Sequence, residues 1–207
     1  MKWPVSKGGV RIGLGLFALA VLLLAVLRWW ERTYPKNPEI ALVIGEPWET
    51  MRQRSSARID PAIPNEIWYT IPKSDARLRF ADPQYGFITP LARFFTVSYI
   101  KGRVDSVRMS PQIEPLPLDD ALKVVLDLQA QWVKAGWEPI HVRDDPPIAD
   151  TLQWRANLAA CESNVSYWSA GQRFQIMLGM ACFQDDKHPD ETRYLITLAL
   201  AKPWVDP

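Results

Sequence analysis

Side chains that usually carry out catalysis are scarce in this chain of 207 residues. It has two histidines and two cysteines, and its ten glycines form no phosphate-binding loop. No serine stands in the Gly-x-Ser-x-Gly setting of a nucleophile elbow. We therefore predict no catalytic residue, no cofactor and no bound metal. An enzyme is the alternative, and it would need a pocket that joins a histidine or a carboxylate pair from distant parts of the chain.

The two histidines, His141 and His188, have no evident partner pattern. His188 stands in the acidic stretch QDDKHPDE, whose carboxylates are of the type that binds divalent cations. The stretch has no recognised metal-loop spacing, and a charged run with a proline between two strands is usually a solvated turn. We interpret it as such a turn.

An excess of positive charge is also missing. The chain has 24 Lys and Arg residues against 23 Asp and Glu residues. Six of the basic residues but only two of the acidic ones lie in the first forty positions, so the remainder has a net charge of −3. Nucleic-acid-binding proteins usually present a basic face. We expect no nucleic-acid partner.

One long apolar run is present. It extends from Ile12 to Leu27 without a charged residue, a little short of the roughly 20 residues that cross a bilayer. The flanking residues extend it, because Arg28 can reach lipid headgroups and Trp29 and Trp30 suit the membrane interface. A cleaved signal peptide is an alternative, but the bulky, charged residues after Leu27 offer no cleavage site. A buried helix of a soluble domain is another, but it has nothing local to pack against.

The run therefore predicts a transmembrane signal-anchor and a single-pass protein of the bacterial inner membrane, with the lipid bilayer as one partner. The long C-terminal part should be translocated. The predicted division is residues 1–11 in the cytoplasm, residues 12–30 in the membrane, residues 31–40 as a tether, and residues 41–207 as one periplasmic domain.

The two cysteines, Cys161 and Cys182, are predicted to form a disulfide. The sequence between them reads as a hairpin with its turn in SAGQ. If the chain reverses between Gly171 and Gln172, the two cysteines face each other at a separation that suits a disulfide. Two buried free thiols are the alternative. A disulfide would support an oxidising compartment.

The remaining pattern predicts an α+β fold. A short helix is expected over Pro47–Ser55 and a proline-rich loop over residues 57–75. A long helix is expected in LDDALKVVLDLQAQWVKAGWEP, with Asp119 as its N-cap and Gly136 as its end. Strands are expected in ARLRF, in TRYLITLAL, and in a hairpin over FFTVSYIKGRVDSVRM. We predict one antiparallel sheet covered on one face by the long helix, preceded by the N-terminal transmembrane helix.

Tryptophan is unusually frequent, with ten residues. Tryptophan often dominates the energy of protein–protein contacts, because it buries much area with few rotatable bonds. Several lie in loop-like contexts, and arginines make the strand region basic. Core packing and outward-facing sheet positions are the alternatives. The candidate partner-binding residues are Trp68, Trp154, Trp168, Arg77 and Arg79.

The arrangement has two resemblances. The Gly-x-Pro-type helix start at residues 44–55, followed by antiparallel strands, resembles the small lipoproteins of the outer-membrane assembly machinery, although the lipid-bearing cysteine is absent. The plan of tether, compact domain and aromatic-rich surface is similar to that of inner-membrane-anchored immunity proteins, which neutralise toxins delivered by type VI secretion. That resemblance implies a module that binds a toxin stoichiometrically. A structural subunit of an envelope complex and a periplasmic hydrolase are the alternatives.

Overall fold

The computed structural model describes residues 17, 20–26, 28, 36–141, 146–162 and 164–205. Asn37–Pro207 forms one compact unit, separate from Met1–Lys36. The helices of the compact unit are α2 (Trp48–Arg54), α3 (Leu118–Ala135) and α4 (Leu152–Ala159). Its strands are β1 (Glu39–Leu42), β2 (Ile67–Thr70), β3 (Arg77–Phe80), β4 (Phe87–Ile88), β5 (Phe95–Ile100), β6 (Arg103–Met109), β7 (Glu138–Ile140), β8 (Asn164–Ala170), β9 (Phe174–Phe183) and β10 (Arg193–Ala201).

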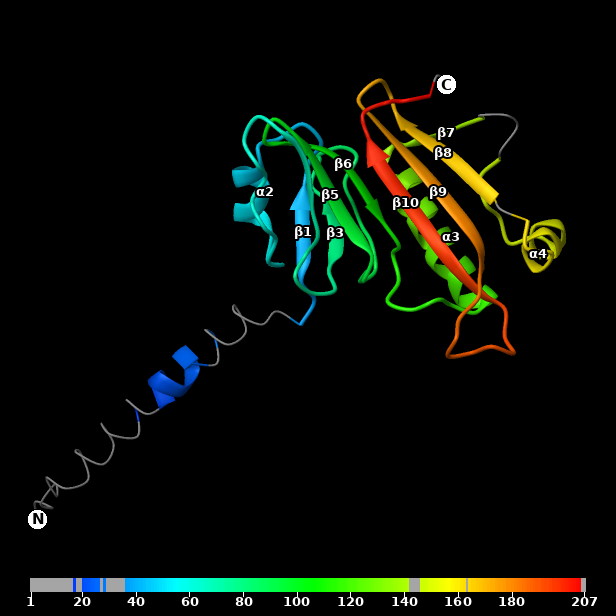
Figure 1. Ribbon diagram of the computed structural model, residues 1–207, viewed down its shortest axis with the longest axis horizontal. Helices are drawn as coiled ribbons and strands as arrows, with labels where there is room; N and C mark the ends of the chain where they lie inside the picture. Colours follow the sequence, from blue (N-terminus) through cyan, green and yellow to red (C-terminus); the bar gives the residue numbers. More distant parts are fainter. Residues whose placement is uncertain are drawn as a thin grey trace, which may run out of the picture. The chain divides into compact units, whose positions relative to one another are not determined.

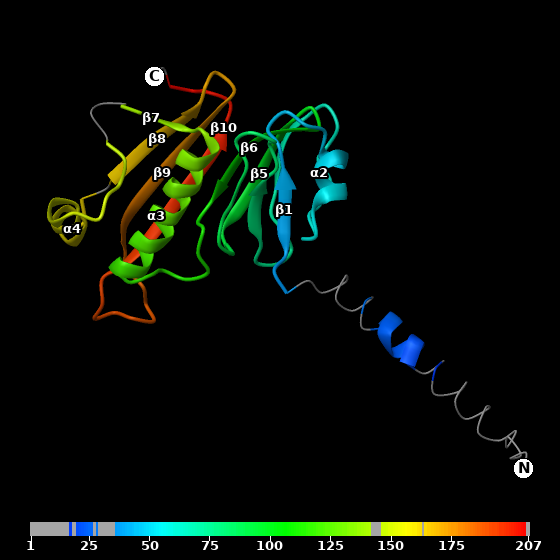
Figure 2. The same cartoon turned by 180° about the vertical axis from the view of Figure 1, so that it is seen from behind.

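The larger sheet has seven strands in the order β2-β5-β6-β10-β9-β8-β7, and every neighbouring pair is antiparallel. Alternate residues of each strand point to the same side of the sheet, and the inner face, on the side of α3, is apolar. Figures 1 and 2 show α3 on one face of β9 and β10, while no helix lies on their other face.

The smaller sheet has the order β1-β3-β4, with β1 parallel to β3 and β4 antiparallel to β3. Its buried side chains belong to the same core cluster as those of the larger sheet and of α3. Aromatic rings join the two sheets: Phe80 of β3 lies edge-on to Phe174 of β9, with centroids 5.0 Å apart, and Phe87 of β4 meets Trp132 of α3 at 5.7 Å. One continuous core therefore holds both sheets together.

The predicted fold class is wrong. The strands form two sheets instead of one, and no helix covers a sheet in the way predicted. Helix α3 packs against β10 and also against β4 of the smaller sheet. The parallel pairing of Glu39–Leu42 with Arg77–Phe80 joins segments almost forty residues apart, so no local pattern in the sequence indicates the smaller sheet.

The prediction of a membrane anchor is also corrected. Among the residues that the structure describes, no helix is both long enough and apolar enough to cross a bilayer. In the predicted anchor, the described residues Phe17, 20–26 and Arg28 are helical and exposed. Trp29 and Trp30 lie outside the described residues. This finding does not support the predicted single-pass inner-membrane location, whereas the lipid bilayer as a partner stays a prediction.

The local predictions for the middle of the chain are confirmed. The hairpin β5–β6 turns at Lys101 and Gly102, which both have positive φ angles, 50° and 75°, as a two-residue type I′ turn requires. Helix α3 ends at Gly136, whose left-handed conformation has φ 85° and whose N–H bonds to the carbonyl of Val133. The prediction of Asp119 as its N-cap is wrong, because Pro117 stands at the N-cap and no side chain caps the helix.

The structure contains the Cys161–Cys182 disulfide, with Cα atoms 5.3 Å apart. The predicted reason for it was wrong. In the β8–β9 hairpin Ala170 pairs with Phe174, a register one residue away from the one assumed. Cys161 lies outside β8, in the turn that follows α4, with φ 59°. The bond therefore joins the end of α4 to β9 and does not link two paired strands.

Candidate functional site

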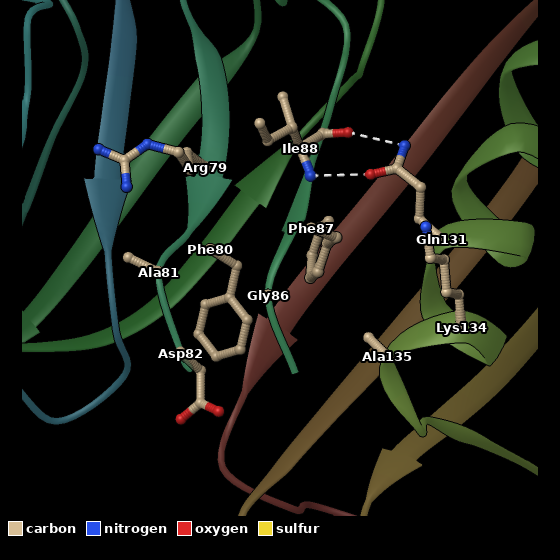
Figure 3. A pocket seen from close by; sticks show the side chains of 10 residues that line it. All are labelled: Arg79, Phe80, Ala81, Asp82, Gly86, Phe87, Ile88, Gln131, Lys134 and Ala135. Atoms are coloured by element: carbon tan, nitrogen blue, oxygen red, sulfur yellow. Dashed lines mark hydrogen bonds between the residues drawn. The ribbon is translucent and has the colours of Figure 1, made fainter. Parts of the chain in front are cut away.

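A groove of about 520 Å³ lies between the ends of β3 and β4 and the C-terminal half of α3 (Figure 3). Its charged or amide side chains are Arg79, Asp82, Gln131 and Lys134. The charged ends of Arg79 and Asp82 point away from each other. The groove thus does not bring these two charged groups together for acid–base chemistry.

The carboxylate of Asp82 is fully engaged in holding a turn. One oxygen, Oδ1, accepts the backbone N–H groups of Gln84 and Tyr85, each at 3.0 Å, and Oδ2 accepts Arg173 at 2.6 Å. The side chain of Asp82 is 1% exposed, whereas that of Arg173 is 54% exposed. This is an Asx-type turn, and the Asp82 side chain is structural because both its oxygens are engaged.

Two other polar side chains of the groove, those of Arg79 and Gln131, are also engaged. Arg79 donates to Glu39 at 2.9 Å. The side-chain amide of Gln131 accepts the N–H of Ile88 and donates to its carbonyl, both at 3.0 Å (Figure 3). The groove therefore offers little unused chemistry, and the free hydrogen-bonding groups must be sought at the edges of the sheets.

A sheet edge exposes backbone N–H and C=O groups that can pair with another strand, so proteins usually close it. Three of the four edges here are closed. Gln131 caps β4 as described. On β1, the N–H of Ala41 donates to Ser55 Oγ at 3.0 Å, and the N–H of Glu39 donates to Ser56 Oγ at 3.0 Å. Strand β7 contains Pro139, which has no N–H to offer.

The fourth edge, β2, is open. The carbonyl of Glu66 accepts the N–H of Lys101 at 3.0 Å and so faces β5. Bonded residues alternate along an antiparallel pair. The backbone groups of Ile67, Tyr69 and Ile71 therefore face outward. Within the described part of the chain, no protein group hydrogen-bonds to them.

The side chains of this edge are unusually exposed for their type. Ile67 is 80% exposed, Tyr69 60%, Ile71 52% and Trp68 42%. The rings of Trp68 and Tyr69 are stacked with centroids 6.1 Å apart. We call Ile67, Trp68, Tyr69 and Ile71 the β2 edge. An exposed apolar strand of this kind is typical of an interaction site.

The strand itself is firmly attached to the core. Thr70 is buried, and its Oγ1 hydrogen-bonds to the hydroxyl of Tyr99 on β5 at 3.0 Å. Burial raises the pKa of the Tyr99 hydroxyl to about 12, although the bond to Thr70 opposes this shift. The inner face of β2 is thus fixed while its outer face and its backbone edge remain free.

Beside the β2 edge lies a hollow of about 320 Å³ on the uncovered face of the larger sheet. Ile71 and Phe94 contribute apolar surface to it, and Phe94 is 63% exposed. Arg93 and Arg108 bring positive charge. Arg93 forms an ion pair with Asp75, with 3.3 Å between Nη2 and Oδ2. The apolar surface of the β2 edge therefore continues onto the sheet face.

Comparisons of this chain with protein-family models, with curated proteins and with solved structures found no match.

The structure separates the predicted partner-binding residues. Trp68 lies on the β2 edge. Trp154 is half-buried on α4, next to the core. Trp168 is 2% exposed and packs edge-on against Trp132 at 5.5 Å, so it presents no surface to a partner. Arg77 and Arg79 lie on β3 of the smaller sheet and share Glu39, at 3.6 and 2.9 Å.

The acidic stretch around His188 forms a local turn. His188 Nδ1 hydrogen-bonds to Asp185 Oδ2 at 2.8 Å, and this bond lowers the pKa of Asp185. Among the described residues, no three histidine, cysteine or carboxylate side chains are grouped as metal ligands would be.

Sequence reasoning missed most of the β2 edge. Residues 57–75 were predicted to be a loop because of their prolines, and only Trp68 was selected there. The signal was present, since IWYT consists entirely of β-branched and aromatic residues, which favour strands.

Proposed function

We propose that the compact unit is a protein-binding module that captures an extended segment of another protein at the β2 edge. The observation that carries the proposal is the contrast between edges: three are closed by side chains or by a proline, and the fourth is open and apolar. A segment added beside β2 would continue the larger sheet, which is the mode called β-strand addition.

The β2 edge provides both parts of such an interaction. The outward N–H and C=O groups of Ile67, Tyr69 and Ile71 would bond to the backbone of the added segment. The side chains would supply the affinity, because Trp and Tyr are the commonest energetic anchors of protein interfaces. The strand is already fixed by the Thr70–Tyr99 hydrogen bond, so binding requires little ordering of the module.

Binding without turnover agrees better with the site than catalysis does. The groove between β3, β4 and α3 has its Asp, Arg and Gln side chains engaged in structural contacts, whereas the open hydrogen-bonding groups lie on a strand. A narrower form of the proposal takes the partner to be a toxin, as the resemblance to immunity proteins implies. The proposal does not need the membrane anchor.

The test uses the full-length chain as bait for a phage-displayed library of random 12-residue peptides. We expect enriched peptides with alternating apolar residues. Their dissociation constants should rise at least tenfold on Ile67→Pro, because this change removes an outward N–H and leaves the bonds between β2 and β5 in place.

The matched control is Leu152→Lys, which alters a side chain that is 90% exposed on α4 and should leave peptide binding unchanged. Circular dichroism spectra that match the wild type would show that both variants fold. Peptides that bind the Ile67→Pro variant as tightly as the wild type would refute the β2 edge as the site.

A further inference from the structure

The β2 edge has the chemical pattern of a surface that pairs with itself. Read from Glu66 to Lys73, the sequence is EIWYTIPK. Tyr69 stands midway between two exposed isoleucines, Ile67 and Ile71, and these three residues carry the outward backbone groups. In an antiparallel pair of identical strands, Tyr69 would face Tyr69 and each Ile67 would face an Ile71.

We propose that the β2 edge binds the β2 edge of a second copy of this chain, so that two seven-stranded sheets become one continuous sheet across a two-fold axis at Tyr69. The inference rests on the proposed function, because it uses the same open edge, and it names the partner. A two-fold contact uses the same patch on both copies, so that patch must be complementary to itself.

The backbone fits this arrangement. Hydrogen-bonded pairs in an antiparallel ladder need residues whose N–H and C=O groups both face the partner. Ile67, Tyr69 and Ile71 meet this condition, and pairing about Tyr69 uses all three from each copy. Pro72 has no N–H, but its backbone lies on the side of β5, so it does not oppose the added strand.

The charges are compatible with a second copy as well. The stretch from Ile67 to Pro72 contains no Asp, Glu, Lys or Arg, so two copies do not repel each other. Glu66 precedes it and Lys73, which is paired with Asp60, follows it. Antiparallel pairing brings the acidic end of one strand to the basic end of the other, whereas parallel pairing would place like ends together.

The side chains extend the contact on the outer face. There the Ile67, Tyr69 and Ile71 side chains of the two copies would alternate in one apolar row, with Ile100 beside it, itself 43% exposed. A contact of a few residues per copy is smaller than the roughly 800 Å² per partner of a standard interface. We therefore expect a dimer that dissociates in the micromolar range.

Cysteine cross-linking tests the arrangement in the full-length chain. The two native cysteines are bonded to each other, so an introduced cysteine is the only free thiol. Tyr69→Cys places two thiols at the axis, where the Cα atoms of a bonded pair lie about 5.5 Å apart, within the range of a disulfide. Mild oxidation should convert most of this variant to a covalent dimer.

The matched control is Ile67→Cys. Two copies of Ile67 would be separated by four residues along the ladder, about 14 Å, too far for a disulfide. We expect at least tenfold less covalent dimer with this variant. Light scattering should show wild-type dimers that weaken at least tenfold on Ile67→Pro and not on Leu152→Lys.

Equal cross-linking of the two cysteine variants, or dimers that persist in Ile67→Pro, would overturn the inference. A wild-type chain that stays monomeric at all concentrations would also overturn it. If that monomer still bound library peptides through the β2 edge, the proposed function would stand and only the second copy as partner would fail.

Discussion

Substitutions of Asp82 can separate what a turn and what an ion pair contribute to the free energy of unfolding. Its two oxygens have different tasks: Oδ1 accepts two backbone N–H groups, and Oδ2 accepts Arg173. Asp82→Asn keeps an oxygen for the backbone and loses the ion pair, whose Arg173 partner is half-exposed and returns to water. Asp82→Ala loses both and leaves the N–H groups of Gln84 and Tyr85 without an acceptor.

A net hydrogen bond contributes about 1 kcal/mol, and a buried donor without an acceptor costs more. A half-exposed ion pair contributes about 1 kcal/mol or less. We therefore expect Asp82→Asn to lower the free energy of unfolding by about 1 kcal/mol and Asp82→Ala by about 3 kcal/mol. The difference between the two variants measures the two backbone bonds.

Urea denaturation followed by tryptophan fluorescence measures these changes. With a slope of about 2 kcal/mol/M, the midpoint should fall by about 0.5 M for Asp82→Asn and about 1.5 M for Asp82→Ala. Equal losses in the two variants would show that the ion pair carries the whole effect, and the reasoning about the turn would be wrong.

Two further predictions concern the disulfide and the buried tyrosine hydroxyls. Replacing both Cys161 and Cys182 by serine should lower the free energy of unfolding by about 3 kcal/mol in the chain-entropy model, because the bond joins positions 21 residues apart. Thiol labelling of the denatured, unreduced wild type should find no free cysteine. Quantitative labelling of both cysteines would contradict the disulfide. Burial raises the pKa of Tyr99 to about 12, and it raises that of Tyr194 too. The stability that the neutral Tyr99 hydroxyl provides should therefore be complete below pH 10 and be lost as the pH rises from 10 to about 12. Alkaline unfolding curves should show a smaller loss of stability for Tyr99→Phe than for the wild type, and an identical loss in that variant would exclude Tyr99 as its source.

The parts of the fold that sequence predicted are those whose signals are local. Gly136 ends α3 because only a left-handed residue fits there, and Lys101 with Gly102 makes the β5–β6 turn. The two-sheet arrangement could not be predicted in this way. The strands of the smaller sheet have four, four and two residues, and their pairing depends on contacts between distant segments.

The candidate site shows the same limit. Trp68 was selected from the sequence because of its residue type, and the structure places it on the β2 edge. The sequence could not show that this strand is an edge, because that depends on which strand lies beside β5. The burial of Trp168 could not be predicted from the sequence either, because it depends on packing against Trp132 of α3.

The position of β10 has a consequence for synthesis of the chain on the ribosome. Of the described strands, β10 is the last to be synthesised, yet it lies at the centre of the larger sheet, between β6 and β9. Until Arg193–Ala201 emerges, β2-β5-β6 and β9-β8-β7 have no strand to join them, and their inner edges stay exposed. The larger sheet therefore cannot be completed before β10 has been synthesised, and until then the nascent chain should be a substrate for chaperones that bind unpaired strands.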